Sequence, residues 1–264
     1  MPIAQINQTA IFYTVDGDPA LPALIFSNSL GTDHRMWQAQ ADALSPFFHV
    51  IRYDTRGHGQ SASPQGPYRL SQLGRDVIAL LDFLGVEKAH FCGLSMGGVT
   101  GQWLGLHAPQ RINKLVIANT AARVGTSAAW LARAASVRTK GLDEVADGAA
   151  ARWFSPAFIE HKPGQVATLI AQLRAGNSEG YASCCEALAG ADFREEIHAI
   201  PNLTLIIAGQ YDPVTSESDA AFLQEKIAAS SMQVLPASHI SNIEAGPAFT
   251  QALSHFLRAD FLQA

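Results

Sequence analysis

The segment Gly93-Leu94-Ser95-Met96-Gly97 places a serine between two glycines, directly after an apolar run that ends at Cys92. A helical pattern follows from Gly98 to His107. On a sharp turn between a strand and a helix, a serine adopts strained backbone angles and projects its hydroxyl above the sheet. Neighbours without a Cβ let the strand and the helix approach closely. We therefore predict that Ser95 is the nucleophile of an acyl-transfer reaction.

The same spacing recurs at Gly176-Asn177-Ser178-Glu179-Gly180, but no strand pattern precedes this second copy. Residues 168–173 have a helical pattern instead. The second copy is therefore typical of a helix end, a short loop and the N-cap of the next helix. We do not expect Ser178 to act as a nucleophile.

A serine hydroxyl needs an imidazole that accepts its proton, and a carboxylate must hold that imidazole in one tautomer. His239 follows the apolar run of residues 232–235, whereas His255 lies within a helical pattern. We predict that His239 is the general base. The remaining histidines are interpreted as surface groups or as hydrogen-bonded core groups.

Asp212 is the predicted acid because it lies directly after the strong strand pattern of residues 203–208. Loops at the C-terminal edge of a parallel sheet collect functional groups, and the order Ser, Asp, His is expected on such a sheet. The end of residues 115–118 is the other place for an acid, and it holds Asn119. The alternative for Asp212 is a turn aspartate before Pro213.

The tetrahedral intermediate of acyl transfer carries an oxyanion that backbone N–H groups can stabilise. One such donor is expected from Met96, the residue after the nucleophile. The other is expected from the loop Ser27-Asn28-Ser29-Leu30-Gly31, which follows the first parallel strand, with Leu30 as the donor.

Short apolar runs alternate with helical patterns along most of the chain, which predicts an α/β fold with a mostly parallel sheet and helices on both faces. A hairpin over residues 5–15 precedes these runs. The predicted strands cover residues 24–26, 49–53, 90–92, 115–118, 203–208 and 232–235, and the predicted helices include residues 70–84, 217–229 and 247–262.

Between Asn119 and Pro201 the strand signal vanishes, and helical stretches cover residues 128–140, 165–175 and 181–189. We predict a helical cap over residues 121–199, inserted after the strand that ends near Ala118. Residues 1–120 and 200–264 then form the sheet-containing core.

The pattern Gly57-x-Gly59-x-x-Ala62 imitates a dinucleotide-binding fingerprint, but Pro64, Gly66 and Pro67 prevent the helix that should hold the pyrophosphate. We therefore expect no nicotinamide or flavin cofactor. The histidines show no metal-ligand spacing with a supporting carboxylate or thiolate, so we expect no metal.

The chain of 264 residues is 48% hydrophobic and carries a formal net charge of −5 without a run of basic residues. This composition predicts a large core and argues against a nucleic-acid or membrane partner. The odd number of cysteines, Cys92, Cys184 and Cys185, argues against a disulfide framework. With no apolar leader after Met1, these features predict a cytoplasmic protein; they leave the oligomeric state open.

Over essentially its whole length, the chain resembles the α/β-hydrolase superfamily, including a D-x-R-G-x-G-x-S turn at residues 54–61. We expect this turn to be structural, with Asp54 and Arg56 buried or capping. Within the superfamily the chain is similar to the 3-oxoadipate enol-lactonases of the β-ketoadipate pathway of aromatic catabolism. The similarity rests on residues 27–33, 36–37, 93–98 and 238–244. Asn28-Ser29 departs from the His-Gly of many superfamily members, which does not affect a backbone donor.

The resemblance implies hydrolysis of a small anionic enol-lactone to 3-oxoadipate through an acyl-enzyme, without a cofactor. The cap is then expected to close over the pocket as a lid. Trp130 and Arg133 share a helix face and would offer an apolar wall and a cation to the substrate carboxylate. A core tryptophan and a solvated arginine are the alternative.

Two other functions use the same fold. The first is a general carboxylesterase or a carbon–carbon bond hydrolase of aromatic degradation, which would keep the same triad. The second is a ligand-binding receptor without turnover, against which the presence of Ser95, Asp212 and His239 argues.

Overall fold

The computed structural model describes residues 2–259, which form one eight-stranded sheet in the order β1-β2-β4-β3-β5-β6-β7-β8. β1 pairs with β2, and β2 with β4, in antiparallel fashion, and the other neighbours are parallel. The strands are β1 (Ile3–Ile6), β2 (Thr9–Asp16), β3 (Ala23–Ser27), β4 (His49–Tyr53), β5 (Ala89–Leu94), β6 (Ile112–Ala118), β7 (Leu203–Gly209) and β8 (Ser230–Leu235). The mostly parallel sheet predicted from the apolar runs is confirmed.

The central strands β3 and β5 are buried at every residue, which explains why their sequences are continuously apolar rather than alternating. β1 and β2 form the predicted hairpin. Its turn contains Asn7 and Gln8 at φ values of 44° and 59°, a left-handed conformation that glycine usually supplies. The absence of glycine there makes the turn hard to recognise in the sequence.

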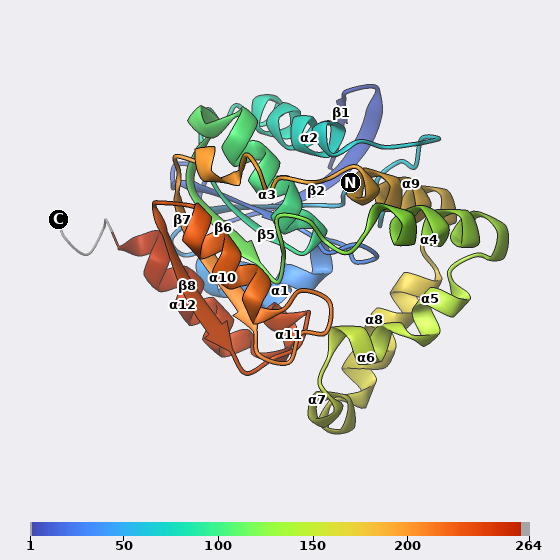
Figure 1. Cartoon of the computed structure of the whole chain (residues 1–264). Helices are drawn as coiled ribbons and strands as arrows, with labels where there is room; N and C mark the ends of the chain where they lie inside the picture. The colour runs from blue at the N-terminus through green and yellow to red at the C-terminus, as the bar shows by residue number, and fades with distance from the viewer. Residues whose placement is uncertain (1, 260–264) are drawn as a thin grey trace.

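Helices cover both faces of the sheet (Figure 1). α2 packs against α3 on one face, and α1 packs against α12 on the other. The core helices are α1 (Gln38–Leu44), α2 (Leu70–Phe83), α3 (Met96–His107), α10 (Glu217–Lys226), α11 (Ser241–Glu244) and α12 (Gly246–Arg258), with 3-10 turns η1 (His34–Trp37), η2 (Pro109–Arg111) and η3 (Ile197–Ala199). The helix predicted over residues 217–229 is shorter, and residues 260–262 of the last predicted helix lie outside the described residues.

Every regular element between β6 and β7 is a helix, and loops join these helices; the domain boundaries stay a prediction. α4 and α9 lie side by side, and the shorter helices gather beside them at one end of the molecule (Figure 1). The insertion contains α4 (Ser127–Lys140), α5 (Asp143–Asp147), α6 (Ala149–Trp153), α7 (Pro156–His161), α8 (Pro163–Arg174) and α9 (Ser178–Ala189). Across residues 2–259, no helix has the length and apolar character that a membrane span requires.

Candidate active site

Ser95 lies on the turn between β5 and α3 at φ 57° and ψ −114°, a strained conformation for a residue with a side chain. Its backbone N–H donates to the carbonyl of Ala118 at 2.9 Å, which ties the turn to β6. A Cβ at Gly93 would lie 2.1 Å from the carbonyl oxygen of Gly97, and a Cβ at Gly97 would lie 2.2 Å from that of Ser27. Both glycines are therefore required by the close approach of strand, helix and neighbouring loop.

The structure brings the three predicted side chains together from the ends of three parallel strands. His239 Nε2 lies 2.9 Å from Ser95 Oγ, and His239 Nδ1 lies 2.8 Å from Asp212 Oδ2. All three residues are buried. Because Asp212 is an acceptor when ionised, Nδ1 carries the proton, and Nε2 is left to accept the proton of the Ser95 hydroxyl.

The carboxylate of Asp212 is fixed by hydrogen bonds to both of its oxygens. Oδ1 accepts the N–H groups of Val214 at 2.8 Å and Thr215 at 3.1 Å, and Oδ2 accepts the Thr215 hydroxyl at 2.8 Å. Burial raises the pKa of Asp212, but the hydrogen bonds and charge of His239 outweigh it, and the net pKa lies below the ordinary value. Asp212 therefore stays ionised at neutral pH and can hold the His239 proton.

Asn119 also belongs to this hydrogen-bond network. The sequence had indicated only that an asparagine, and no acid, stands at this position. Its side-chain amide donates to Asp212 Oδ2 at 3.0 Å and to the Ser238 carbonyl at 3.1 Å, while its oxygen accepts the Ser241 hydroxyl. Asn119 thus links the Asp212 loop to the His239 loop. Its position at the end of β6 was the available signal, because strand ends of this sheet converge there.

The two predicted oxyanion donors lie beside Ser95. Gly97 donates its N–H to the Asn28 carbonyl at 3.1 Å, which fixes the loop after β3 against the start of α3. Leu30, like Ser95, lines the cavity, and Met96 is the first residue of α3. Within the described part of the chain, neither Leu30 N–H nor Met96 N–H donates to a protein group, so both are available to a ligand.

The Ser95 hydroxyl opens into a cavity of about 270 Å³ between the sheet edge and the helical insertion. Trp130 and Arg133, which were predicted to share a helix face, both line it. The Arg133 guanidinium lies over the Trp130 ring at 4.9 Å from its centre, and Trp130 Nε1 donates to the Val124 carbonyl at 2.6 Å. The aromatic ring therefore holds the cation at the cavity wall.

Arg152 is a second cation in this cavity that the sequence did not single out. Its Nη2 donates to the Val145 carbonyl at 2.7 Å, and a Cβ at Gly148 would lie 2.6 Å from its Nη1, so the glycine leaves room for the guanidinium. Burial, followed by the charge of Arg133, lowers the pKa of Arg152, which stays cationic at neutral pH. Two arginines that repel each other thus share one cavity.

Neither arginine of the cavity is neutralised by the protein. Among the described residues, no aspartate or glutamate lines the cavity, and neither Arg133 nor Arg152 forms an ion pair. Other basic residues of the insertion pair with carboxylates: Arg123, Arg138, Lys140, Arg174 and Arg194. Two unpaired, half-buried guanidinium groups favour an anionic ligand.

Ser178 is the first residue of α9, where the Asn177 side chain caps the helix by accepting the Gly180 N–H at 2.8 Å. The interpretation of this second copy as an interhelical loop and N-cap is confirmed. The predicted interruption after Gly57-x-Gly59 is confirmed too, because no helix lies between Gly59 and Arg69, and α2 begins only at Leu70.

One cluster within residues 2–259 has the composition of a metal site, although the sequence spacing predicted none. Ligand atoms of Asp33, His34 and Asp54 lie within 4.8 Å of one another. Asp54 Oδ1 accepts His34 Nδ1 at 2.7 Å, and Asp33 pairs with Arg35 at 2.5 Å. Because these atoms already have hydrogen-bond partners, the cluster is explained as a set of loop anchors.

The family model described as the alpha/beta hydrolase fold matches residues 22–246. This chain belongs to the α/β-hydrolase family. This α/β-hydrolase is 51% identical over 264 residues to 3-oxoadipate enol-lactonase 2 of Acinetobacter baylyi, covering 98% of this chain and 99% of that one.

Solved structures give the same picture of this α/β-hydrolase. The crystal structure of the enol-lactonase from Burkholderia xenovorans matches with a TM-score of 0.94 and 42% identity, covering 100% of both chains. A malate-bound thermophilic esterase from Thermogutta terrifontis matches with a TM-score of 0.91 and 25% identity, covering 97% of this chain and 96% of that one.

Proposed function

We propose that this α/β-hydrolase opens 3-oxoadipate enol-lactone to 3-oxoadipate, a step of the β-ketoadipate pathway. The observation that carries the proposal is the pairing of the Ser95–His239–Asp212 chain with two unpaired arginines in one cavity. The lactone supplies both an acyl carbon for the serine and a carboxylate for the arginines. The similarity to named enol-lactonases supports the same substrate.

The reaction begins when His239 Nε2 takes the proton of Ser95 Oγ and the oxygen attacks the lactone carbonyl. The resulting oxyanion accepts hydrogen bonds from the N–H groups of Leu30 and Met96. Collapse breaks the ring carbon–oxygen bond, and His239 returns its proton to the departing enol oxygen. Because the substrate is a ring, the leaving group stays attached to the acyl chain.

Water completes the cycle. It gives a proton to His239 and its oxygen to the acyl carbon, and the second tetrahedral intermediate releases Ser95 with its proton restored. The product enol becomes the ketone of 3-oxoadipate by moving its own proton to carbon. No electrons are transferred in either half of the reaction. Each proton that His239 accepts is passed on to the enol oxygen or back to Ser95 Oγ.

Arg133 and Arg152 are proposed to bind the carboxylate of the carboxymethyl arm. A guanidinium group offers paired donors that match a carboxylate, and Trp130 provides the apolar wall beside them. Since the arm remains part of the acyl-enzyme, the same contact holds the substrate through both halves of the reaction. The cap, which we take as residues 121–199, therefore selects the substrate while the core performs the chemistry.

A paired assay tests this function. The loss of the enol-lactone's ultraviolet absorbance is followed beside the hydrolysis of a neutral nitrophenyl ester, and kcat/KM is compared. A value for the lactone at least about a hundredfold above that for the ester is expected from a desolvated arginine–carboxylate contact. The reverse order would favour the general carboxylesterase.

We also infer a cytoplasmic location, as expected from the odd cysteine count. The support is that all three thiols are free and buried. Burial raises the pKa of the Cys92 and Cys184 thiols well above the ordinary value, which keeps them protonated and unreactive. A small-molecule substrate is the partner that the cavity fits.

A further inference from the structure

The loop that carries Leu30 is anchored at three points by one neighbouring segment, residues 53–58. Asn28 Nδ2 donates to the Tyr53 carbonyl at 2.8 Å. Gly31 N–H donates to His58 Nε2 at 3.0 Å, and His34 N–H donates to Asp54 Oδ1 at 2.8 Å. The anchors lie three residues apart, and Leu30 lies between the first two.

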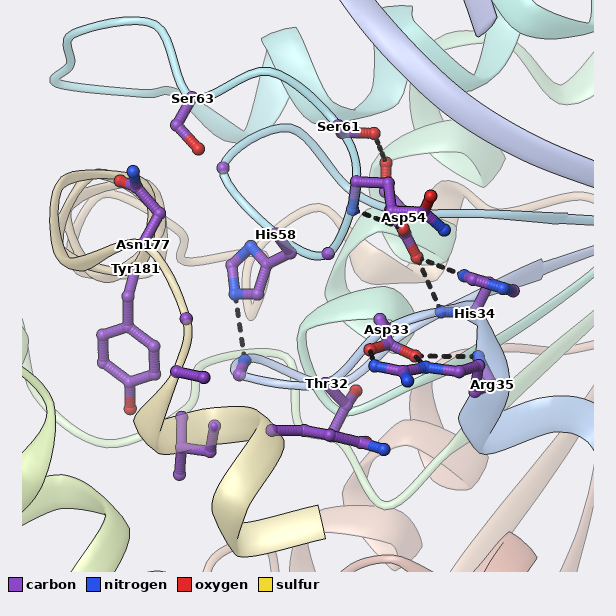
Figure 2. Close-up of a pocket in the computed structure, with 18 of the residues that line it drawn as sticks. Thr32, Asp33, His34, Arg35, Asp54, His58, Ser61, Ser63, Asn177 and Tyr181 are labelled. Carbon is purple, nitrogen blue, oxygen red and sulfur yellow. Dashed lines mark hydrogen bonds and ion pairs between the residues drawn. The ribbon is translucent and has the colours of Figure 1, made fainter. Parts of the chain in front are cut away.

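In the middle anchor, the acceptor of the loop N–H is a ring nitrogen of His58. His58 faces a second cavity of about 620 Å³, where Figure 2 shows its hydrogen bond to the loop. The loop lies between this cavity and the active-site cavity: residues 31–35 line the former, Ser29 and Leu30 line the latter, and Leu173 and Tyr181 line both. His58 therefore acts on the loop from the side opposite to the substrate.

The contacts of His58 define its protonation state. Nε2 accepts a backbone N–H and so carries no proton, while Nδ1 faces the Arg56 carbonyl at 3.4 Å and carries the proton. Burial lowers the pKa of His58, which keeps the ring neutral. A neutral ring with this tautomer is the form that can hold the Gly31 N–H.

The surroundings leave the loop and the turn little freedom to rearrange. Gly31 has φ 83°, and a Cβ there would lie 2.6 Å from Leu173 Cδ1 of the cap. Gly57, next to His58, packs so closely on α9 that its Cβ would lie 2.5 Å from Gly180 Cα. The imidazole is thus fixed between the cap helix and the loop, and its hydrogen bond orients the Leu30–Gly31 peptide.

We propose that His58 is a positioning residue for the oxyanion site: its neutral Nε2 holds the Gly31 N–H and thereby keeps the Leu30 N–H aimed at the developing oxyanion. This rests on the proposed role of Ser95 as nucleophile. His58 does not touch the substrate, so its loss weakens the stabilisation of the transition state and leaves substrate binding almost unchanged.

The test compares two unbranched replacements of equal length, His58→Gln and His58→Met. The glutamine amide oxygen can accept the Gly31 N–H, whereas the methionine methyl cannot. Removing a full oxyanion donor costs about a hundred- to a thousandfold, so a displaced donor in His58→Met is expected to lower kcat about ten- to a hundredfold, with KM within about threefold of wild type. His58→Gln is expected to keep kcat within about threefold of wild type.

Both variants are assayed on the enol-lactone and on a neutral nitrophenyl ester. An oxyanion forms with either substrate, so the kcat loss of His58→Met should be equal on both, and the ester keeps the test independent of the lactone assignment. Val77→Ala, which removes buried methyl groups in α2 away from the site, is the control for lost stability and should lower Tm without changing kcat.

The proposal is overturned if His58→Met keeps wild-type kcat, or if His58→Gln loses as much as His58→Met. A loss confined to KM would overturn it as well, because it would make His58 a determinant of substrate binding. A boronic acid that bonds to Ser95 gives an independent check, since its affinity should fall by the same factor as kcat in His58→Met.

Discussion

The Gly-x-Ser-x-Gly pattern occurs twice in this chain, and the two copies differ in everything except spacing. Residues 93–97 follow a buried strand, and Ser95 is held at φ 57° with its hydroxyl 2.9 Å from His239 Nε2. Residues 176–180 join α8 to α9, and Asn177 caps the second helix. Across residues 2–259, no histidine or carboxylate hydrogen bonds to Ser178. A serine in this pattern can therefore act as a nucleophile only where a strand precedes it and where the sheet edge places a histidine and a carboxylate beside it.

The largest expected contrast between the copies is the loss of the serine at the sheet edge. Ser95→Ala should fold normally, because alanine fits the turn, and should lower kcat by about ten-thousandfold or more, as expected when a triad nucleophile is removed. Single-turnover and steady-state assays measure the loss. Retention of more than about a tenth of wild-type kcat would remove Ser95 from its proposed role.

The next largest effect is expected from Asp212→Asn. Ser95 hydrogen bonds to His239, which Asp212 holds, whereas in the described part of the chain Ser178 hydrogen bonds to no histidine or carboxylate. The two backbone N–H groups at Oδ1 require the asparagine oxygen there, which turns its NH2 toward the Asn119 amide and His239. Donors then face donors and His239 favours the wrong tautomer, so kcat should fall about a thousand- to ten-thousandfold. Full activity would mean that another group orients His239.

The helical insertion lends the Ser95 site the positive charges of Arg133 and Arg152, and not its own Ser178. Arg133→Ala and Arg152→Ala should each lower kcat/KM for the enol-lactone about ten- to a hundredfold, the value of a partly desolvated arginine–carboxylate contact. A neutral ester should be almost unaffected. Arg174→Ala is the matched control, because Arg174 is exposed and pairs with Asp143 and Asp147.

Two outcomes would revise the role of the cap arginines. Equal losses on the anionic and the neutral substrate would mean that the arginine supports the fold of the cap. No loss on either substrate would mean that the arginine does not contact the bound substrate.

The partners of Ser95 also predict how kcat/KM depends on pH. The reaction needs one protonation state of Ser95, His239 and Asp212, so kcat/KM should fall about tenfold per pH unit where a single one of these groups gains a proton. The lowered pKa of Asp212 keeps that carboxylate ionised in the same range, so the acid limb should have a slope of one. A slope of two in a pH–rate profile would contradict this assignment.

The smallest expected effect is that of Ser178→Ala. Ser178 is the first residue of α9, and Asn177 is the N-cap residue of that helix. Both kcat and KM of Ser178→Ala should therefore stay within about twofold of wild type, as for most surface substitutions. Asn177→Ala sharpens the comparison, since losing an N-cap costs about 1 kcal/mol and should lower Tm. A tenfold loss of kcat in Ser178→Ala would contradict the interpretation of the second copy.

Local patterns predicted the elements that carry the chemistry. Continuous apolar runs identified the buried strands, and the glycines around Ser95 indicated a turn that the backbone at φ 57° requires. The order of Ser95, Asp212 and His239 after three strands predicted their convergence, because parallel strands end at one edge of the sheet. In contrast, α5, α6 and α7 have five or six residues each, fewer than two turns, and so show no helical periodicity.

Local patterns were therefore enough to predict the fold class, the position of the serine turn and the three residues proposed for the chemistry. Only packing placed Asn119 against Asp212, Arg152 beside Arg133 in the cavity, and His58 Nε2 against the Gly31 N–H. The difference comes from the range over which each interaction acts. Backbone preference and hydrophobic period act between neighbours in the chain, whereas Asn119 and Asp212 lie 93 residues apart. Contacts at that separation exist only once the sheet and the cap have packed.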